Sequence, residues 1–430
     1  MMTSRFLRLL LAACLLGIAA LSGGCSSGDG RQIVVLGPWT GPEGAAFERV
    51  LDHLSEGSRY RYVYKGTRSL RETLVAQLAA DAPPDVAILN SIGELTEYAT
   101  RNKLKRLDQS TAERAYAPWS PTLMVEGWHR TFWVPLKVDL KSMVWSRAGS
   151  SSAHPRWCVG MAAQATSGWP GTDWVEDILL HQAGPETYGR WATGQLNWAT
   201  SPEVKRAFTT WAGLLRAGGP RGSAVQRSLT MSFWGTPAPH DPDGDPRGLL
   251  GGSMPGCTHE HQGSFVRYVY APRNDIRLEP AARFLHGSAA YSKAFEVSGD
   301  MAAVLTDNPG AQELVKRLTS EDGREQWSRT AQPHLRPFFP DRSDPQPDDN
   351  AAAQEIASYL TDARNTLCFD ASDVMPPVLR DAFYRAVLEY FRSPYEATLR
   401  KLLGQLETVR TQIAAAQTPE GIRPPTDICR

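Results

Sequence analysis

Ile33-Val34-Val35-Leu36 is a run of apolar, mainly β-branched residues, which is typical of a buried strand. Apolar residues then recur at helical spacing over 46–54 and again over 70–80, where one face is expected to hold Leu70, Leu74, Val75 and Leu78. Between and after these two segments lie the strand-like stretches 60–64 and 85–90. Strand, helix, strand, helix and strand in succession predict a parallel sheet with helices on both faces. We therefore expect an α/β fold.

Ligands of parallel α/β sheets bind beyond the carboxyl ends of the strands. The loops expected at those ends contain polar and aromatic residues: Trp39, Thr40, Glu43 and Asn90. We expect these four residues to face a ligand.

The start of the chain has the pattern of an export signal. Arg5 and Arg8 precede an apolar run over 9–21, which is shorter than the ~20 residues that a membrane-spanning helix needs. Ser22-Gly23-Gly24-Cys25 then resembles a bacterial lipobox, with the Leu one place further from the Cys than usual. We predict a lipoprotein signal peptide over 1–24, lipidation at Cys25 and a tether over 25–32. The alternative is an ordinary secretory signal with an incidental Cys.

Composition and length indicate which partners, how many lobes and which metal sites to expect. Lys and Arg number 46 and Asp and Glu number 46, so nothing indicates nucleic acid as a partner. A length of 430 residues exceeds what one core usually supports, which suggests two lobes. No CxxC spacing is present, and the two ligands of His259-Glu260-His261 do not make a site, so we expect no metal and no cofactor.

Export also implies an oxidising compartment in which cysteines pair. If Cys14 is removed with the signal and Cys25 is acylated, four cysteines remain: Cys158, Cys257, Cys368 and Cys429. Four cysteines allow three pairings, and the spacing alone does not select one.

A second candidate site is Ser167-Gly168-Trp169-Pro170-Gly171-Thr172-Asp173-Trp174. We interpret it as a loop that leads into a helix over 175–181, with Thr172 or Asp173 as the cap. The C–H face of a sugar stacks on an indole, and its hydroxyls bond to a carboxylate, so this loop suits a carbohydrate. The alternative is that both indoles belong to the core.

The order of several motifs resembles the family 1 extracellular solute-binding proteins of ABC sugar importers. The resemblance covers nearly all of the chain after the signal, and order and spacing carry it more than any single motif. Its α-glucoside-binding branch resembles the chain most, because of 155–160, 167–174 and the residues after Cys257. The motifs are Trp39-Thr40-Gly41-Pro42-Glu43, Pro83-Pro84-Asp85, and the stretches 103–108, 133–145, 296–302 and 369–377.

This resemblance implies a two-lobe, type II periplasmic-binding-protein-like fold with hinge crossovers. The first α/β lobe would comprise 33–137 and 297–340, and the second 138–296 and 341–430, including helices over 382–415 interrupted at Ser393-Pro394. All four cysteines would lie in the second lobe. We favour the pairs Cys158–Cys257 and Cys368–Cys429, which leave the hinge free, although the other pairings within that lobe stay open.

The resemblance implies that the protein is a lipid-anchored monomer at the outer face of the cytoplasmic membrane. It would capture an α-glucoside or oligosaccharide and deliver it to ABC permease subunits. Trp133 and Trp145 flank a crossing strand and are expected in the core instead, whereas Trp191, Trp198 and Trp211 are at helical positions and are expected in the core or in surface packing. The expected ligand-binding residues are Trp39, Thr40, Glu43, Asp85, Asn90, Lys137, Asp139, Trp169, Thr172, Asp173, Trp174, Gln262 and Asp300.

Two other functions remain open at this point. A secreted glycosidase would need two carboxylates ~5–10 Å apart across a sugar, and the chain has acids enough for that. No nucleophile elbow, H-E-x-x-H motif or phosphate loop is present, so we do not expect an enzyme. A glycan-sensing lipoprotein without a transport role would share the fold. The Pro/Asp/Gly-rich loop 237–250 has no predicted role.

Overall fold

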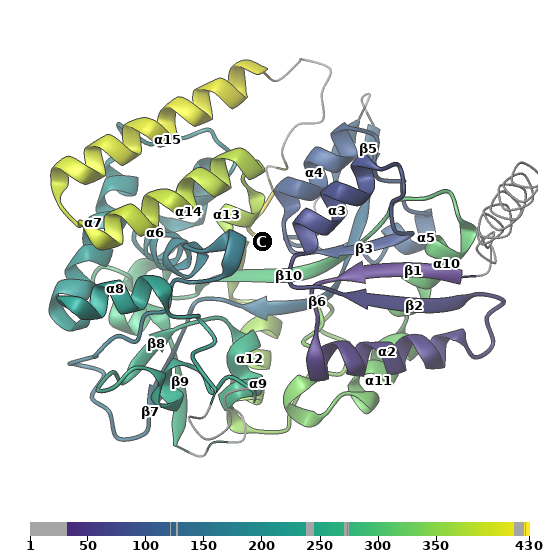
Figure 1. Cartoon of the computed structure of the whole chain (residues 1–430), viewed down its shortest axis with the longest axis horizontal. Helices are drawn as coiled ribbons and strands as arrows, with labels where there is room; N and C mark the ends of the chain where they lie inside the picture. The colour runs from purple at the N-terminus through teal and green to yellow at the C-terminus, as the bar shows by residue number, and fades with distance from the viewer. Residues whose placement is uncertain are drawn as a thin grey trace, which may run out of the picture.

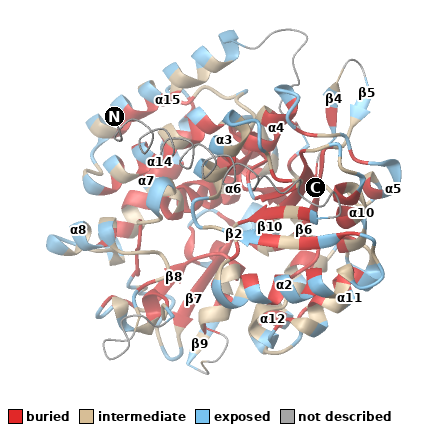
Figure 2. Ribbon diagram, turned by 45° about the vertical axis from the view of Figure 1, so that its right-hand side comes forward, coloured by how far each residue is buried: buried red, intermediate tan, exposed pale blue. Residues whose placement is uncertain are grey.

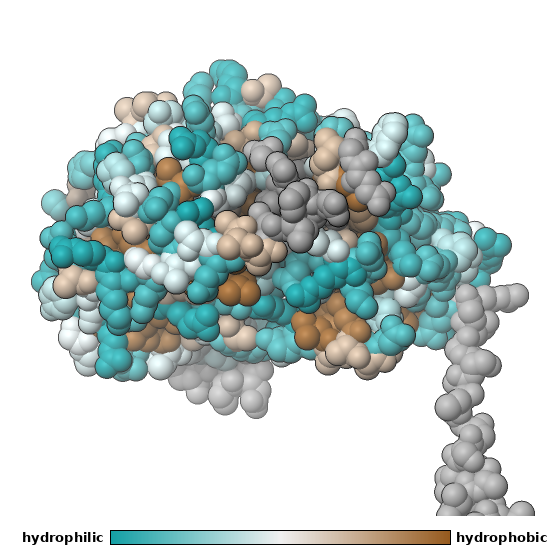
Figure 3. Space-filling model, turned by 90° about the horizontal axis from the view of Figure 1, so that it is seen from above, coloured by the Kyte–Doolittle hydropathy of each residue, from teal (hydrophilic) through white to brown (hydrophobic). Residues whose placement is uncertain are grey.

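A computed structural model describes residues 32–120, 122–125, 128–237, 245–270, 273, 275–416, 425 and 427–430. The predicted signal peptide, Cys25 and most of the tether lie outside the described residues, as does part of the loop 237–250. Within the described residues, no helix combines the length and the apolar character needed to cross a bilayer. The face in Figure 3 is largely hydrophilic, with hydrophobic residues in small separate patches.

The predicted parallel sheet is present and organises one half of the molecule. Strands β1 (Gln32–Gly37), β2 (Arg61–Gly66) and β3 (Val86–Leu89) are parallel, with β1 between the other two. Helices α2 (Gly41–Ser55) and α3 (Leu70–Ala79) connect them, as the spacing predicts. One detail of α3 is wrong: Val75, predicted on its apolar face, is 50% exposed, and Leu74 is the helix's buried residue.

Further elements complete this half, which is the first lobe (Figure 1, right). A small hairpin is formed by β4 (Leu123–Val125) and β5 (Trp128–Arg130). A separate apolar core lies between the sheet and helix α2. The helices are α4 (Ile92–Thr100), α5 (Gln109–Ala112), α10 (Pro309–Leu318) and α11 (Glu321–Thr330).

Two long antiparallel strands connect the halves. Strand β6 (Trp133–Leu140) pairs with β10 (Ala294–Val304), and both run across the middle of the molecule (Figure 1). The first half of β10 also pairs with β11 (Thr366–Phe369), and its second half pairs with β3. The two strands are buried along most of their length (Figure 2). They therefore form the floor between two lobes, and the predicted two-lobe α/β fold is confirmed.

The second lobe is mostly helical (Figure 1, left). Its three-stranded antiparallel sheet has the order β8 (His259–His261), β7 (Met143–Arg147), β9 (Ile276–Pro280). Its helices, with α12 at the junction, are α6 (Trp169–Ala192), α7 (Pro202–Gly218), α8 (Ser223–Thr230), α9 (Arg267–Tyr270), α12 (Ala351–Thr361), α13 (Ala371–Val374), α14 (Pro377–Arg392) and α15 (Glu396–Ala416). Short 3-10 turns occupy Gln164–Thr166, Ser264–Val266, Ala281–Phe284, Ala289–Tyr291 and Pro333–Leu335, and a π turn occupies Leu249–Ser253.

The start of α6 differs from the predicted loop and cap. The helix begins at Trp169, six residues before the predicted start, and continues to Ala192 with a kink at Gly184. Pro170 lies in the first turn, where its missing N–H costs nothing and its fixed φ suits a helix. Gly168 precedes it with φ 110°, and a Cβ there would lie 2.4 Å from the Tyr384 carbonyl oxygen. Glycine therefore sets the start of the helix, and no side chain caps it.

Other predictions for the second lobe are confirmed. The C-terminal segment forms two helices, α14 and α15, separated at Ser393-Pro394. Both favoured disulfides are present, Cys158–Cys257 and Cys368–Cys429. Trp133 and Trp145, assigned to the core, are buried, and so are Trp191, Trp198 and Trp211, for which surface packing was the alternative.

Candidate functional site

A cavity of about 1220 Å³ lies between the two lobes, above the crossing strands. The first lobe contributes the start of α2, the turn before α3, and the residues after β3. The second lobe contributes the first turn of α6, the α8–π-turn connection and the start of α14. Its size and its position between domains are typical of a small-molecule site.

The floor at the first-lobe end is built around Lys137 on β6. Its Nζ lies 2.5 Å from Oε1 of Glu43 and 3.4 Å from Oδ2 of Asp300 on β10. Burial alone would lower the pKa of Lys137, but the Glu43 and Asp300 carboxylates raise it instead. Trp39 Nε1 donates to Asp300 Oδ2 at 2.9 Å, and Lys137 Nζ lies 5.1 Å from the Trp39 ring. This end of the floor is thus a fixed array of charges beside an indole.

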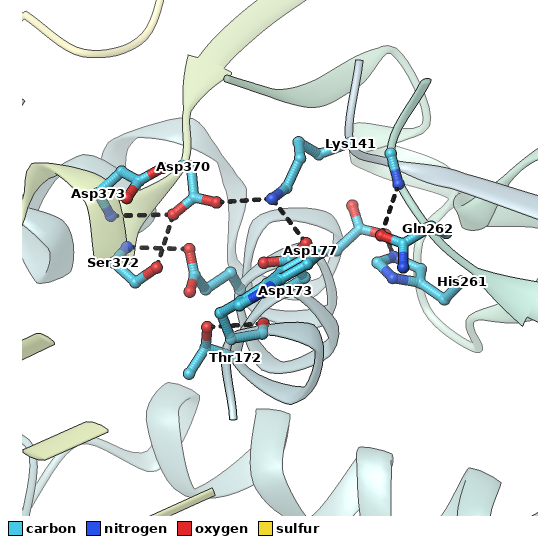
Figure 4. Close-up of polar contacts among 12 residues, drawn as sticks. Lys141, Thr172, Asp173, Asp177, His261, Gln262, Asp370, Ser372 and Asp373 are labelled. Atoms are coloured by element: carbon cyan, nitrogen blue, oxygen red, sulfur yellow. Dashed lines mark hydrogen bonds and ion pairs between the residues drawn. The ribbon is translucent and has the colours of Figure 1, made fainter. Parts of the chain in front are cut away.

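The floor at the second-lobe end is built around Lys141, which follows β6. Its Nζ lies 2.7 Å from Oδ2 of Asp173 and 3.1 Å from Oδ2 of Asp370 (Figure 4). Asp370 also caps α13, because its carboxylate accepts hydrogen bonds from the Asp373 amide at 3.0 Å and the Ser372 hydroxyl at 2.8 Å. Lys141 Nζ lies 4.8 Å from the ring of Trp169.

Several carboxyl groups crowd around Lys141. Burial raises the pKa of Glu176, Glu296 and Asp373 well above the usual range, and neighbouring carboxylates add to the effect for all three. Burial also raises the pKa of Asp173 to about 7, against the opposing effect of Lys141. Near neutral pH much of this cluster is therefore protonated.

The same cluster is the group of described residues best suited to hold a metal ion. Single carboxylate oxygens of Asp173, Glu296 and Asp370 lie within 4.8 Å of one another. However, the Lys141 ammonium already bonds to two of these three carboxylates. The cluster therefore has its own cation, and we assign no metal to it.

Asp139 lies between the two lysines on β6. Its Oδ1 accepts a hydrogen bond from the Ser264 hydroxyl at 2.6 Å. Burial raises its pKa to about 6, although Lys137 and Ser264 act in the opposite direction. Asp139 therefore supplies a mostly ionised acceptor in the centre of the floor at neutral pH.

An aromatic wall rises from the second lobe beside the floor. Trp169 packs edge-on against Phe233, with ring centroids 4.7 Å apart, and against Phe265 at 5.8 Å. Trp234 packs against Phe265 at 5.6 Å and against Tyr268 at 5.2 Å. All five rings line the cavity. Apolar faces beside fixed charged acceptors and donors can stack on a ring with C–H faces and bond to its hydroxyls.

Four charged side chains join the lobes at the rim of the cavity. Arg380 of α14 donates to Glu94 of α4 at 2.7 Å, and both side chains are nearly inaccessible to solvent. Arg71 of α3 bonds to Glu94 at 3.2 Å and to Asp381 of α14 at 2.8 Å. This network links helices of opposite lobes in the observed conformation.

Known proteins of similar sequence are binding proteins. The α-glucosides-binding periplasmic protein AglE of Rhizobium meliloti is 25% identical over 400 residues, covering 84% of this chain and 83% of AglE. The osmoprotective compounds-binding protein GgtB of Synechocystis is 24% identical over 401 residues, covering 84% of this chain and 89% of GgtB. No family model matches the sequence.

Solved structures of similar fold are sugar receptors. The solute receptor AcbH, with its preference for β-D-galactopyranose, has a TM-score of 0.66 at 12% identity, covering 89% of this chain and 99% of AcbH. RafE in complex with raffinose has a TM-score of 0.62 at 11% identity, covering 89% of this chain and 99% of RafE. The resemblance to family 1 solute-binding proteins is confirmed.

Most residues predicted to bind a ligand do line the cavity. In the first lobe and on the crossing strands these are Trp39, Thr40, Glu43, Asn90, Lys137, Asp139 and Asp300, and in the second lobe Trp169 and Asp173. Whether each contacts a ligand remains a prediction. Trp39 is only 3% exposed, because Phe47, Tyr64 and Trp327 pack around it. It therefore belongs to the first-lobe core and offers little stacking area.

Two predicted residues of the 167–174 stretch do not reach the cavity. The prediction assumed a loop, whereas the first turn of α6 presents Trp169 and Asp173, four positions apart, to the cavity. Thr172 is fully buried and donates to the Trp169 carbonyl oxygen. Trp174 is 3% exposed and stacks on His261, with ring centroids 4.5 Å apart. Thr172 and Trp174, predicted as ligand contacts, therefore lie outside the lining of the cavity.

Asp85 and Gln262, also predicted as ligand contacts, do not line the cavity. Asp85 precedes β3, so it lies at the amino end of the strand and not at the carboxyl end. Its carboxylate accepts from the Val34 amide at 2.9 Å and the Thr306 hydroxyl at 2.6 Å. Gln262 is 2% exposed, and its side-chain oxygen accepts from the Gly263 amide. Both side chains stabilise backbone near the sheets.

The His259-Glu260-His261 motif has a structural role. His261 Nε2 lies 2.9 Å from Asp177, whereas Glu260 accepts a hydrogen bond from Tyr270. Alternation along β8 points Glu260 to the face opposite His259 and His261, so the three side chains do not converge on one point.

Several cavity residues were not predicted. Arg71, Arg380, Phe233, Trp234 and Tyr268 all line it. Pro237, Asp245 and Pro246, at the described edges of the loop 237–250, line it as well. No local motif marks these residues, since they meet only when the lobes are assembled.

Proposed function

We propose that the protein is an extracytoplasmic lipoprotein that captures a carbohydrate between its lobes and delivers it to an ABC importer. The observation that carries this proposal is the interlobe cavity, which combines an aromatic wall with a floor of fixed carboxylates and ammonium groups. The ligand we propose is an α-glucoside or oligosaccharide. Support comes from AglE, whose name states that it binds α-glucosides.

Closure of the lobes would couple capture to delivery. We propose boundaries between lobes near residues 137 and 297 on the crossing strands and near 340, so that each lobe moves as a body. Ligand binding favours a closed state only by the difference in affinity between the two states. Membrane-embedded permease subunits would then recognise the closed form. The protein would act as a monomer.

The lipid anchor is proposed from residues 1–25 of the sequence. Replacing Cys25 with Ser should release the exported protein from the membrane fraction and abolish its labelling by radioactive palmitate. Retention of both properties would contradict the anchor. The two curated relatives are named as binding proteins, which supports a function without catalysis.

The function is tested by calorimetry on the purified protein with maltose, sucrose, trehalose and maltooligosaccharides. We expect at least one sugar to bind with a stoichiometry of about one, and chromatography after incubation to show intact sugar. Trp169→Ala serves as the matched variant, in which that binding should weaken. Binding of none of these sugars would contradict the proposal, and cleavage products would indicate a glycosidase.

A further inference from the structure

We propose that the cavity selects carbohydrates by charge, accepting uncharged and amine-bearing carbohydrates and rejecting those that carry a carboxylate or a phosphate. This inference rests on the proposed carbohydrate-binding function, and it specifies the charge class of the ligand. It is drawn from the excess of carboxylates over cations along the crossing strands.

The first-lobe end of the floor has two carboxylates for one ammonium group. Lys137 lies between Glu43, at 2.5 Å, and Asp300, at 3.4 Å. When all three are ionised, this group has one excess negative charge. The Lys137 ammonium is already satisfied by the protein, so it is not an anchor for an anionic ligand.

The second-lobe end also has two carboxylates beside one ammonium group. Lys141 lies 2.7 Å from Asp173 and 3.1 Å from Asp370, and both carboxylates are 2% exposed (Figure 4). Because the pKa of Asp173 is raised to about 7, this group is close to neutral at pH 6.5. The Lys141 ammonium is satisfied by the protein, so it is not an anchor for an anionic ligand either.

Asp139 adds a negative charge between the two lysines. Residues at alternate positions on a strand face the same side, so Lys137, Asp139 and Lys141 share one face over roughly 13 Å. Burial raises the pKa of Asp139 to about 6, and the Asp300 and Glu43 carboxylates contribute to that shift. Asp139 thus adds a carboxylate to a floor on which the neighbouring Asp300 and Glu43 carboxylates already disfavour further negative charge.

The other cations near the floor are also paired. Arg380 and Arg71 bond to Glu94 and Asp381, as described above. Arg267 donates to Asp349 at 2.8 Å. In the described part of the cavity, the one arginine with neither an ion pair nor a hydrogen-bonded carboxylate is Arg68, which is exposed at the rim. Arg336 also lines the cavity; its carboxylate partner, Asp348, lies 3.9 Å away, and its buried Nε has no hydrogen-bond partner among the described residues. Arg336 is therefore the partly buried cation most open to an anionic ligand, whereas both floor lysines are bound to carboxylates. Charges interact more strongly at depth than in water.

Matched probes can test charge selection by calorimetry at pH 6.5: D-glucose, D-glucuronate, the uncharged methyl ester of D-glucuronate, and D-glucosamine. We expect glucuronate to bind at least about tenfold more weakly than glucose and its own methyl ester. Glucosamine should bind at least as tightly as glucose. Glucuronate that binds as tightly as its methyl ester would overturn the inference. Binding of all four would still agree with the proposed function, so the two failures are distinguishable.

A pair of variants separates charge selection from a general loss of binding. Asp139→Asn removes one floor charge with little change of shape, so the ratio of glucose to glucuronate affinity should fall about fivefold. Asp307→Asn is the control, because Asp307 is 86% exposed beside Lys105 and does not line the cavity. An affinity ratio unchanged in Asp139→Asn, with the thermal melting temperature retained, would contradict the role of the floor.

Discussion

Truncating either of two tryptophans on α6 should have opposite consequences, although they are only five positions apart. Trp169 lines the cavity, with Phe233 and Phe265 at its edges. Trp174 is 3% exposed and packs between His261 and Trp157, at ring distances of 4.5 and 4.7 Å. The account assigns the first indole to ligand binding and the second to folding.

The magnitudes follow from the area that each ring buries. A tryptophan buries roughly 200 Å², and a ligand stacked on one face would cover about half of it. At about 25 cal/mol per Å² this is ~2.5 kcal/mol, or up to ~70-fold in affinity. Because association also orders the ligand, we expect Trp169→Ala to lower affinity by roughly 10- to 50-fold. Trp174→Ala opens a cavity in the core and should cost about 3–5 kcal/mol of unfolding free energy.

Calorimetry with the tightest-binding sugar and urea denaturation should be run on both variants. Trp169→Ala should lose affinity with a smaller loss of stability. Trp174→Ala should lose stability, and its folded fraction should retain affinity within a few-fold. Wild-type affinity in folded Trp169→Ala would refute the assignment of the aromatic wall to the ligand. A large affinity loss in stable Trp174→Ala would refute the placement of that ring.

Three further predictions concern stability, each measured by urea denaturation. Burial raises the pKa of Glu260 from 4.5 to about 8. Between about pH 5 and pH 8 the folded state therefore keeps a proton that the unfolded state has released, so the free energy of unfolding should fall as the pH rises through this range. Glu260→Gln should remove up to about 1.4 kcal/mol per pH unit of that slope, and an unchanged slope would contradict the shift. Cys257→Ser should cost about 2–5 kcal/mol with the ligand affinity unchanged, whereas a loss below about 1 kcal/mol would contradict a stabilising disulfide. Glu94→Ala leaves the buried Arg380 without its main partner and should lower the free energy of unfolding by about 3–5 kcal/mol. Arg71→Ala changes a side chain that is 35% exposed and should lower it by less than about 1 kcal/mol. Equal losses in the two variants would contradict this contrast.

Periodicity was sufficient to predict the parallel sheet and its helices. Short runs of mainly β-branched residues, such as 33–36, favour buried strands. The intervals between the three predicted strands each have the length and spacing of a helix. The pairing of Cys158 with Cys257 followed from the expected lobes and not from spacing. Strands and helices that are marked by a periodic apolar pattern could therefore be predicted without the structure.

The site was less predictable because it depends on local geometry and on distant segments. Trp169 and Trp174 look equivalent in the sequence, and only the early start of α6 separates them. Pro170 reads as a turn residue, but it is equally suited to the first turn of a helix. Arg380 and Glu94 lie 286 positions apart, and no local pattern predicts their contact.

The central claim is that carbohydrate binds between the lobes, above β6 and β10. A crystal structure of the complex with the tightest-binding sugar tests it most directly. We expect the sugar to lie against Trp169, with hydroxyls bonded to Asp139 or Asp173, and contacts from both lobes. A sugar bound on the outer surface of one lobe, with the cavity occupied only by solvent, would contradict the account.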